Sequence, residues 1–211
     1  MPQTIGYDDV VGMLRAAAAK VRDEQLMLSR LDSVIGDGDH GTTMRRAMDL
    51  VEKACDESKA GTLKGLLNDV GWAVLGVDGG ATGPLLGMFF IGMAEAAPEA
   101  NSMDLAAAAA AFEGGLANLR KQTPAQVGDK TMVDALAPAV AALRAAADAG
   151  DACEQAFRKA ACAAEAGAQS TRNVPARFGR ARNLGDRSIG HQDAGATSIA
   201  LVFRAFADTL K

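Results

Sequence analysis

Aromatic residues are scarce in this sequence. They make up 4% of its 211 residues, with a single tryptophan and a single tyrosine. Cysteine is also rare, since Cys55, Cys153 and Cys162 are scattered and form no C-x-x-C pair. Three dispersed thiols provide no disulfide framework, which favours a protein of the reducing cytoplasm.

The sequence has neither an excess of positive charge nor a long apolar run. Its 26 acidic and 22 basic side chains give a formal net charge of −4, so a nucleic-acid partner is not expected. The most apolar stretch, residues 79–94, is interrupted by glycine and is shorter than the roughly 20 residues that span a membrane. Residues 1–10 contain Asp8 and Asp9 and no apolar segment typical of a signal peptide. We therefore expect a cytoplasmic protein without a membrane partner.

Alanine-rich segments with helical periodicity fill most of the chain. Apolar residues recur three and four positions apart, as in the series that contains Val10, Leu14 and Val21. Helices are expected over residues 8–22, 23–33, 43–58, 63–76, 84–97, 103–121, 130–148, 152–171 and 195–210. No breaker separates the first two segments, which are counted as one helix. The pattern predicts an all-α barrel or bundle of about eight antiparallel helices in a single domain, residues 1–211, with a kink at Pro138.

Four polar loops interrupt the expected helices, at residues 36–43, 79–83, 128–131 and 179–195. In an up-and-down bundle, every second connection emerges at the same end. These loops follow the second, fourth, sixth and eighth segments, and merging the first two segments shifts every count equally. The sequence therefore predicts that all four loops meet at one end.

Residues 31–43, Leu-Asp-Ser-Val-Ile-Gly-Asp-Gly-Asp-His-Gly-Thr-Thr, form the most distinctive segment. Asp37 and Asp39 are two positions apart, and Asp32 lies near the end of the preceding helix. Carboxylates this close repel one another unless a cation lies between them. Oxygen ligands in a glycine-bent loop suit Mg²⁺ or Ca²⁺, although aspartates that only form turns or cap helices could have the same spacing.

Two other interpretations of this segment fail. An EF-hand would need a bidentate glutamate where this chain has Met48. Residues 36–41 match the G-x-G-x-x-G pattern of dinucleotide-binding proteins, but that pattern should follow a strand, and residues 26–35 are typical of a helix.

The remaining loops carry groups that suit a phosphate ligand. Both histidines, His40 and His191, lie in loops beside glycine and aspartate, which favours hydrogen bonding near a ligand over a purely structural role. Thr42 and Thr43 begin a helix, where amides and hydroxyls bind phosphate well, although either could be only an N-cap. Residues 79–83 end just before Pro84 and could either approach a ligand closely or form a tight turn.

The third and fourth loops add positive charge. Residues 128–131 contain Lys130, with capping by Asp129 as the alternative to ligand binding. Residues 177–195 are too polar and glycine-rich to be expected as a helix, and they contain four arginines: Arg177, Arg180, Arg182 and Arg187. Arginines beside a metal loop indicate phosphate charge to be neutralised, although a solvated surface loop would have a similar composition.

Together these segments resemble the nucleotide-binding L subunit of dihydroxyacetone kinase. The matching blocks are residues 35–41, 79–83, 128–132 and 179–198, and they occur in the family's order. The resemblance implies a barrel of eight antiparallel helices that binds ADP or ATP at one end. It also implies two Mg²⁺ ions between the phosphates and three loop aspartates, which are Asp32, Asp37 and Asp39 in this chain.

The resemblance further implies which residues contact the nucleotide: His40, Gly41, Thr42, Thr43, Ala81, Thr82, Gly128, Arg180, Asp193 and Gly195. Arg180 would also be catalytic, because an arginine neutralises charge as the phosphoryl group moves. The chain departs from the family pattern at Thr82, where serine is usual, and at Ala194, where proline is usual.

In that family the substrate is held covalently by a histidine of a separate K subunit. The resemblance therefore implies a K subunit as partner and a triose or tetrose as substrate. Some members exchange ATP from solution, whereas others keep ADP and recharge it from a phosphohistidine protein of the sugar phosphotransferase system. This chain has no obvious nucleophile of its own, which agrees with such a division of labour.

Two other functions remain open from the residues. Aspartate-bound Mg²⁺ could activate water, which would make the chain a phosphoester hydrolase of helical fold. Alternatively, the loops could do no more than cap the helices of a regulatory module.

Overall fold

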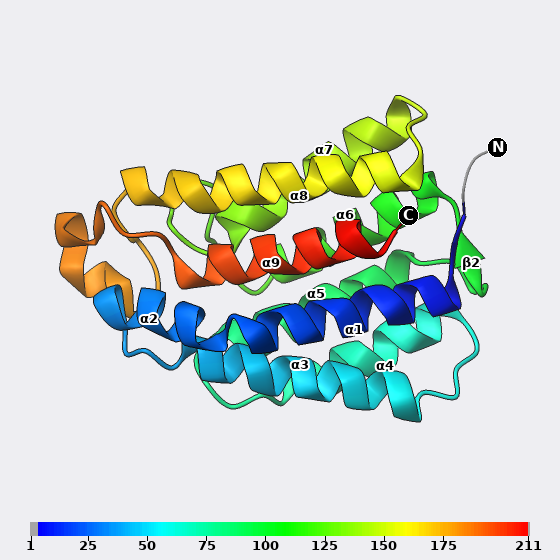
Figure 1. Ribbon diagram of the computed structural model, residues 1–211, viewed down its shortest axis with the longest axis horizontal. Helices are drawn as coiled ribbons and strands as arrows, with labels where there is room; N and C mark the ends of the chain where they lie inside the picture. The colour runs from blue at the N-terminus through cyan, green and yellow to red at the C-terminus, as the bar shows by residue number, and fades with distance from the viewer. Residues whose placement is uncertain (1–3, 211) are drawn as a thin grey trace.

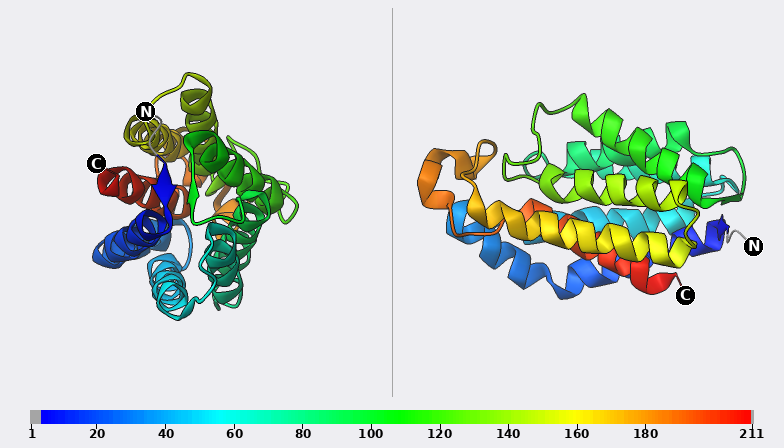
Figure 2. Two further views of the ribbon diagram at one scale, coloured as in Figure 1. Left: turned by 90° about the vertical axis from the view of Figure 1, so that its right-hand side faces the viewer. Right: turned by 90° about the horizontal axis from the view of Figure 1, so that it is seen from above.

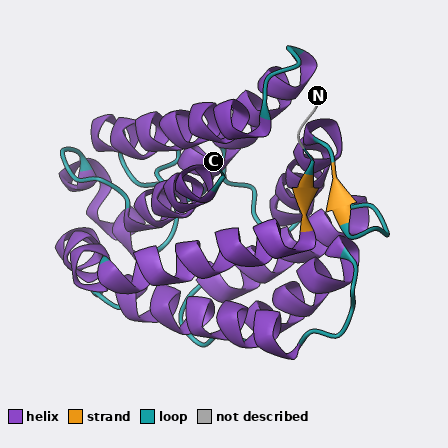
Figure 3. Ribbon diagram, turned by 45° about the vertical axis from the view of Figure 1, so that its right-hand side comes forward, coloured by secondary structure: helices purple, strands orange, loops and turns teal. Residues whose placement is uncertain are grey.

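The structure, a computed structural model, describes residues 4–210 and is predominantly helical (Figures 1 and 3). Its α-helices are α1 (Tyr7–Asp23), α2 (Gln25–Ile35), α3 (His40–Glu57), α4 (Leu63–Leu75), α5 (Thr82–Ala96), α6 (Leu105–Arg120), α7 (Val133–Asp148), α8 (Cys153–Ser170) and α9 (Ala194–Thr209). Two 3₁₀ helices, η1 (Thr171–Asn173) and η2 (Arg180–Ser188), follow α8. A two-residue strand, β1 (Ile5–Gly6), pairs in antiparallel fashion with β2 (Ser102–Met103).

The helices form a closed barrel. Helix α4 packs against α5, α5 against α6, α7 against α8, and α8 against α9. The ring closes where α1 lies between α9 and α3, and an end-on view shows the helices around a common centre (Figure 2). This arrangement confirms the predicted all-α barrel of antiparallel helices.

The few aromatic residues are concentrated in the core of the barrel. Phe112 of α6 contacts the rings of Phe89, Phe157, Phe203 and Phe206, with ring centroids 5.5–6.3 Å apart. Buried alanines from seven of the helices fill much of the remaining core. Small side chains let helix axes approach closely, so the barrel wall is densely packed and rigid.

Three helix boundaries differ from the prediction. Glu24 adopts a non-helical conformation and separates α1 from α2, so the expectation of one continuous helix was wrong. Helix α3 begins at His40, with Asp39 as its N-cap residue, so Thr42 and Thr43 lie inside its first turn and neither is an N-cap. The expectation that residues 177–195 avoid helix was also wrong, because η2 occupies part of this segment, with a kink at Gly185.

The predicted gathering of the four loops is confirmed. The α2–α3, α4–α5, α6–α7 and α8–α9 connections all contribute to one cavity at the end of the barrel that carries η2. Helix α7 continues through Pro138 as a single element. Within residues 4–210, no helix has both the length and the apolar character that crossing a lipid bilayer requires.

Candidate functional site

The cavity at the loop end has a volume of about 320 Å³, which is within the range of roughly 300–1,000 Å³ typical of small-molecule sites. Each of the four loops contributes part of its wall: Asp32, Asp37, Asp39 and His40, then residues 79–82, 130–133, 178–181 and 193–195. Segments more than 150 residues apart in the chain therefore meet around one space.

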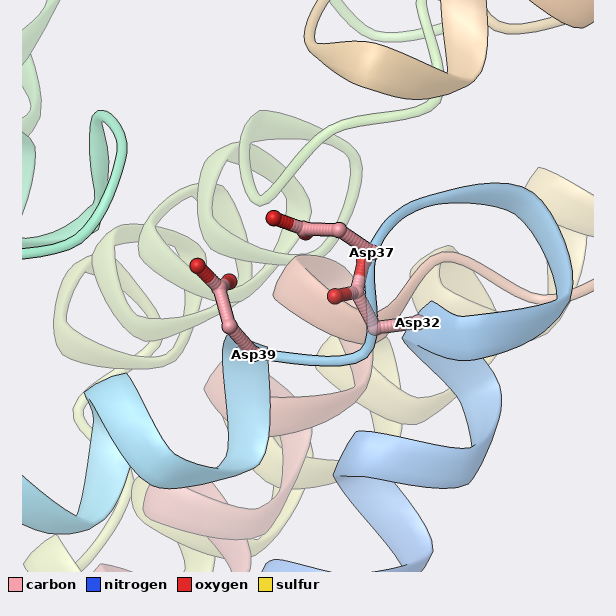
Figure 4. A group of neighbouring side chains, drawn as sticks. All are labelled: Asp32, Asp37 and Asp39. Carbon is pink, nitrogen blue, oxygen red and sulfur yellow. The ribbon is translucent and has the colours of Figure 1, made fainter.

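Three carboxylates form an acidic cluster on one wall of this cavity. Asp32 lies in the last turn of α2, Asp37 in the following loop, and Asp39 directly before α3. One oxygen from each carboxylate lies within 4.8 Å of the others, and the three side chains approach a common space (Figure 4). The structure thus brings together the three predicted metal ligands.

The electrostatics of the cluster fit a bound cation. Partial burial and the negative charges of Asp37 and Asp32 raise the pKa of Asp39, while Arg180 opposes this shift. Carboxylates that repel one another in this way gain from a divalent cation between them. An all-oxygen donor set of this kind suits Mg²⁺, which also retains water and phosphate ligands.

Arg180 connects the fourth loop to the acidic cluster. It is the first residue of η2 and forms an ion pair with Asp37. Its side chain remains 68% exposed, so the guanidinium is accessible to a ligand in the cavity. Arg180, the positively charged side chain predicted for this site, therefore lies directly beside the predicted metal ligands.

His40 is buried against the cavity wall. Its Nε2 lies 3.1 Å from the hydroxyl oxygen of Ser198 in α9, and its amide lies 3.3 Å from a carboxylate oxygen of Asp32. Burial lowers the pKa of His40, although Asp32 opposes this shift. A neutral imidazole is therefore expected at pH 7, where it can donate or accept a hydrogen bond.

Asp193 faces the same cavity from the start of α9. Its carboxylate caps this helix by accepting a hydrogen bond from the amide of Ala196 at 2.7 Å. Burial raises the pKa of Asp193 to about 7, with Asp134 and Asp32 adding to the shift and Lys130 opposing it. The neighbouring Gly195 also lines the cavity.

The second loop reaches the cavity through Gly79, Gly80, Ala81 and Thr82. Gly79 has a φ of 126°, and a β-carbon there would lie 2.4 Å from the hydroxyl oxygen of Thr43. Only glycine fits both this conformation and this contact. The loop is thereby held against the first turn of α3, beside the acidic cluster.

Four residues predicted to contact a nucleotide do not line this cavity: Gly41, Thr42, Thr43 and Gly128. Gly41 packs against α2, and Gly128 donates its amide to the Asp134 carboxylate at 2.7 Å. Thr42 and Thr43 line an adjoining hollow instead. The side chain of His191 is exposed and lies outside the cavity wall, so the structure gives no support to its expected place near a ligand.

Sequence reasoning missed the part played by Lys130. This residue has a φ of 61° and is buried, and its ammonium group donates to the carbonyl oxygens of Thr171, Val174 and His191. Burial lowers its pKa, an effect that Asp193 and Asp134 oppose. Lys130 lines the cavity as the predicted cation of this loop, but its ammonium group is engaged by backbone carbonyls and fastens the fourth loop to the third. No signal in the sequence distinguishes a buried lysine from an exposed one here.

The chain is similar to known proteins over most of its length. The model of the DAK2 domain family matches residues 34–208. The chain is 38% identical over 204 residues to the ADP-binding subunit DhaL of the PEP-dependent dihydroxyacetone kinase of Escherichia coli K12, and 97% of each chain is covered. It is 36% identical over 206 residues to the ADP-binding subunit DhaL of PEP-dependent dihydroxyacetone kinase 1 of Listeria innocua, with 98% of each covered.

A solved structure shares the fold. The dihydroxyacetone kinase of C. freundii, crystallised with AMP-PNP and Mg²⁺, superposes with a TM-score of 0.73 at 28% sequence identity. The match covers 94% of this chain and 33% of the C. freundii chain, so this chain corresponds to one part of that longer enzyme.

Proposed function

The chain belongs to the DAK2 domain family, and we propose that it is the nucleotide-binding, phosphoryl-transferring subunit of a dihydroxyacetone-type kinase. One observation carries the proposal: four loops from distant parts of the chain enclose a cavity that has three clustered carboxylates on one wall. The similarity supports it, since the E. coli and Listeria innocua subunits are matched over nearly their full extent.

In this proposal Asp32, Asp37 and Asp39 hold two Mg²⁺ ions, and the cavity behind them holds ADP or ATP. The donor set is suitable, because all three ligands are carboxylates with oxygens within 4.8 Å of one another. When bound, magnesium would neutralise phosphate charge and fix the orientation of the phosphates. The C. freundii kinase was crystallised with the same two components, Mg²⁺ and an ATP analogue.

The chain's own residues would position the nucleotide. Neutral His40 offers a hydrogen bond in a buried setting, and the exposed Arg180 guanidinium offers charge to the phosphates. Ala81, Thr82, Asp193 and Gly195 complete the walls of the cavity. Thr42 and Thr43 would act from the adjoining hollow, whereas Gly41 and Gly128 would act by shaping the backbone.

The acceptor sugar is proposed to lie on a partner K subunit. The walls of the cavity contain no thiol among the described residues, and their one histidine, His40, is buried and bonded to Ser198. A triose or tetrose would therefore be presented by another chain, with this chain supplying charge neutralisation and positioning. The two DhaL relatives belong to kinases described as PEP-dependent, which supports a phosphohistidine protein as the donor that recharges bound ADP.

Isothermal titration calorimetry tests the proposal directly. We expect the purified chain to bind ADP in the presence of Mg²⁺ and to lose this binding in chelator or in the Asp37→Asn variant. Asp129→Asn provides a control, because Asp129 is an aspartate of the third loop that does not line the cavity. Equal ADP binding with and without Mg²⁺ would contradict the proposal, and turnover of a phosphoester by this chain alone would favour the hydrolase instead.

A further inference from the structure

A second hollow adjoins the acidic cluster and shares part of its lining with the main cavity. Its walls are formed by residues 37–39, by Thr42, Thr43 and Arg46, and by Asp78 and Gly79. Asp37, Asp39 and Gly79 line both spaces. Two carboxylates of the acidic cluster therefore border both the main cavity and this second hollow.

The positively charged side chain of this hollow, Arg46, comes from α3. Arg46 follows Thr43 by three residues and Thr42 by four, so its side chain lies on the side of the helix that both threonines border. Arg46 is the only basic side chain among the described residues that line the hollow. It shares the lining of the hollow with three acids, Asp37, Asp39 and Asp78.

Arg46 has no ion-pair partner within 4 Å among residues 4–210, which sets it apart from its neighbours. The adjacent Arg45 pairs with Asp49 at 2.9 Å, and Arg22 of α1 pairs with Asp49 and Glu52. Arg22 and Arg45, on the face formed by α1 and α3, are thus both paired with carboxylates of the same chain. Arg46 is exposed and left available in the hollow beside the proposed metal ligands.

We propose that Arg46 binds the terminal phosphoryl group of a nucleoside triphosphate in this second hollow. The inference rests on the proposed function, which puts the nucleotide in the main cavity and the metals at the acidic cluster; it adds that only the ADP part of the nucleotide stays within that cavity. A third phosphoryl group then extends past the cluster, into the space that Arg46 and the hydroxyls of Thr42 and Thr43 line. An uncharged sugar offers a guanidinium no charge to pair with, whereas a phosphoryl group offers oxygens in the geometry that arginine prefers.

Comparing two nucleotides on this chain alone tests the inference without any transfer reaction. The probes are ADP and AMP-PNP, each titrated by calorimetry at saturating Mg²⁺. In Arg46→Gln we expect the Kd for AMP-PNP to rise about tenfold or more, as for loss of a hydrogen bond to a charged group, while the Kd for ADP changes less than about twofold. Arg46→Lys, which keeps the charge but not the fork of donors, should give an intermediate AMP-PNP affinity.

The control is Arg45→Gln, one residue along the same helix, where the side chain is engaged with Asp49. This variant should leave both affinities unchanged. Equal weakening of ADP and AMP-PNP by Arg46→Gln would overturn the inference, as would an unchanged AMP-PNP affinity. So would a wild-type chain that binds Mg–ADP but not Mg–AMP-PNP, because it would show no accommodation of a third phosphoryl group. A wild-type chain that binds neither nucleotide would instead refute the proposed function.

Discussion

The guanidinium of Arg180 is ion-paired with the carboxylate of Asp37, although the two residues are 143 positions apart in the chain. Asp37 comes from the loop after α2, and Arg180 begins η2 in the longest connection of the barrel. The pair joins the acidic cluster to residues 177–195, the segment in which the sequence predicted no helix and the structure has η2. It also places a positive charge where a phosphate bound through the aspartates would need it.

Replacing Arg180 with glutamine should impair transfer more than binding. Charge stabilisation at a transferring phosphoryl group contributes most in the transition state, so we expect kcat to fall about 10²-fold or more in the complex with a K subunit. The Kd for Mg–ADP should change less than about tenfold, and stability should change by less than about 1 kcal/mol because the pair is largely exposed. Steady-state kinetics, calorimetry and thermal melting measure the three quantities.

Arg182→Gln is the matched control for Arg180, because Arg182 is exposed on the same 3₁₀ helix and does not line the cavity. It should retain normal kcat. If Arg180→Gln retained normal kcat as well, the proposed catalytic part of Arg180 would be wrong.

Asp193 should make the stability of the ligand-free protein depend on pH. Its pKa is about 7 in the folded chain and about 3.9 in an unfolded one, so the folded state binds the proton more tightly. The resulting stabilisation is fully present below about pH 4 and is lost as pH rises through about 7. We expect Asp193→Asn to remove this decline in the free energy of unfolding, measured by urea denaturation across the same pH range.

Asp104→Asn controls for the capping part of that effect. Asp104 caps α6 by accepting a hydrogen bond from the amide of Ala107 at 2.8 Å, but it is exposed. The wild type and both variants share the lowered pKa of His40, which acts in the opposite direction, so differences between them isolate Asp193. An identical pH dependence in the wild type and Asp193→Asn would contradict this prediction.

Lys130 should stabilise the fourth loop through its hydrogen bonds to backbone carbonyl oxygens. Lys130→Met keeps an unbranched side chain, one atom shorter, but leaves the carbonyl oxygens of Thr171, Val174 and His191 without their shared donor. A buried polar group without a partner costs about 1–3 kcal/mol. Only the bond to Thr171 is fully buried, and the other two acceptors can turn to water, so we expect the free energy of unfolding to fall by roughly 2–3 kcal/mol. Hydrogen exchange should accelerate mainly within residues 171–193.

The exposed Lys121→Met variant is the control for Lys130, since Lys121 ends the helix before the third loop, which carries Lys130. It should change neither stability nor exchange. A loss of stability in Lys130→Met without faster exchange in residues 171–193 would show that this lysine does not hold the loop.

The parts of the site that could be predicted from the sequence are those whose residues lie close together in the chain or on helices that can be counted. Asp32, Asp37 and Asp39 are close in sequence, and helix counting placed the other loops beside them, so periodicity and local spacing were sufficient. The burial of Lys130 could not be predicted, because the carbonyl oxygens that accept its hydrogen bonds lie 41, 44 and 61 residues away in the chain. Such contacts depend on how the third and fourth loops fold over one another, which no local pattern specifies.

Gly41 is a second residue whose contacts could not be predicted from local sequence. The resemblance indicated a nucleotide contact, but the structure places Gly41 in the first turn of α3 against α2, where a β-carbon would lie 2.1 Å from the carbonyl oxygen of Gln25 and 2.8 Å from the amide nitrogen of Ser29. Its position therefore depends on the packing of two backbones. This packing also sets the distance between Asp32 at the end of α2 and Asp39 at the start of α3.

Gly41→Ala should consequently weaken both the fold and the site. Forcing a methyl group against backbone atoms requires α2 and α3 to separate, so we expect a loss of about 1–3 kcal/mol in the free energy of unfolding and a weaker Mg–ADP affinity through displacement of Asp32. Gly76→Ala is the control, because Gly76 has a φ of −86° and a β-carbon there would have no neighbouring atom within 4 Å among the described residues. Denaturation and calorimetry on both variants test the link. If Gly41→Ala lost stability but bound Mg–ADP normally, the spacing of α2 and α3 would not control the geometry of the acidic cluster.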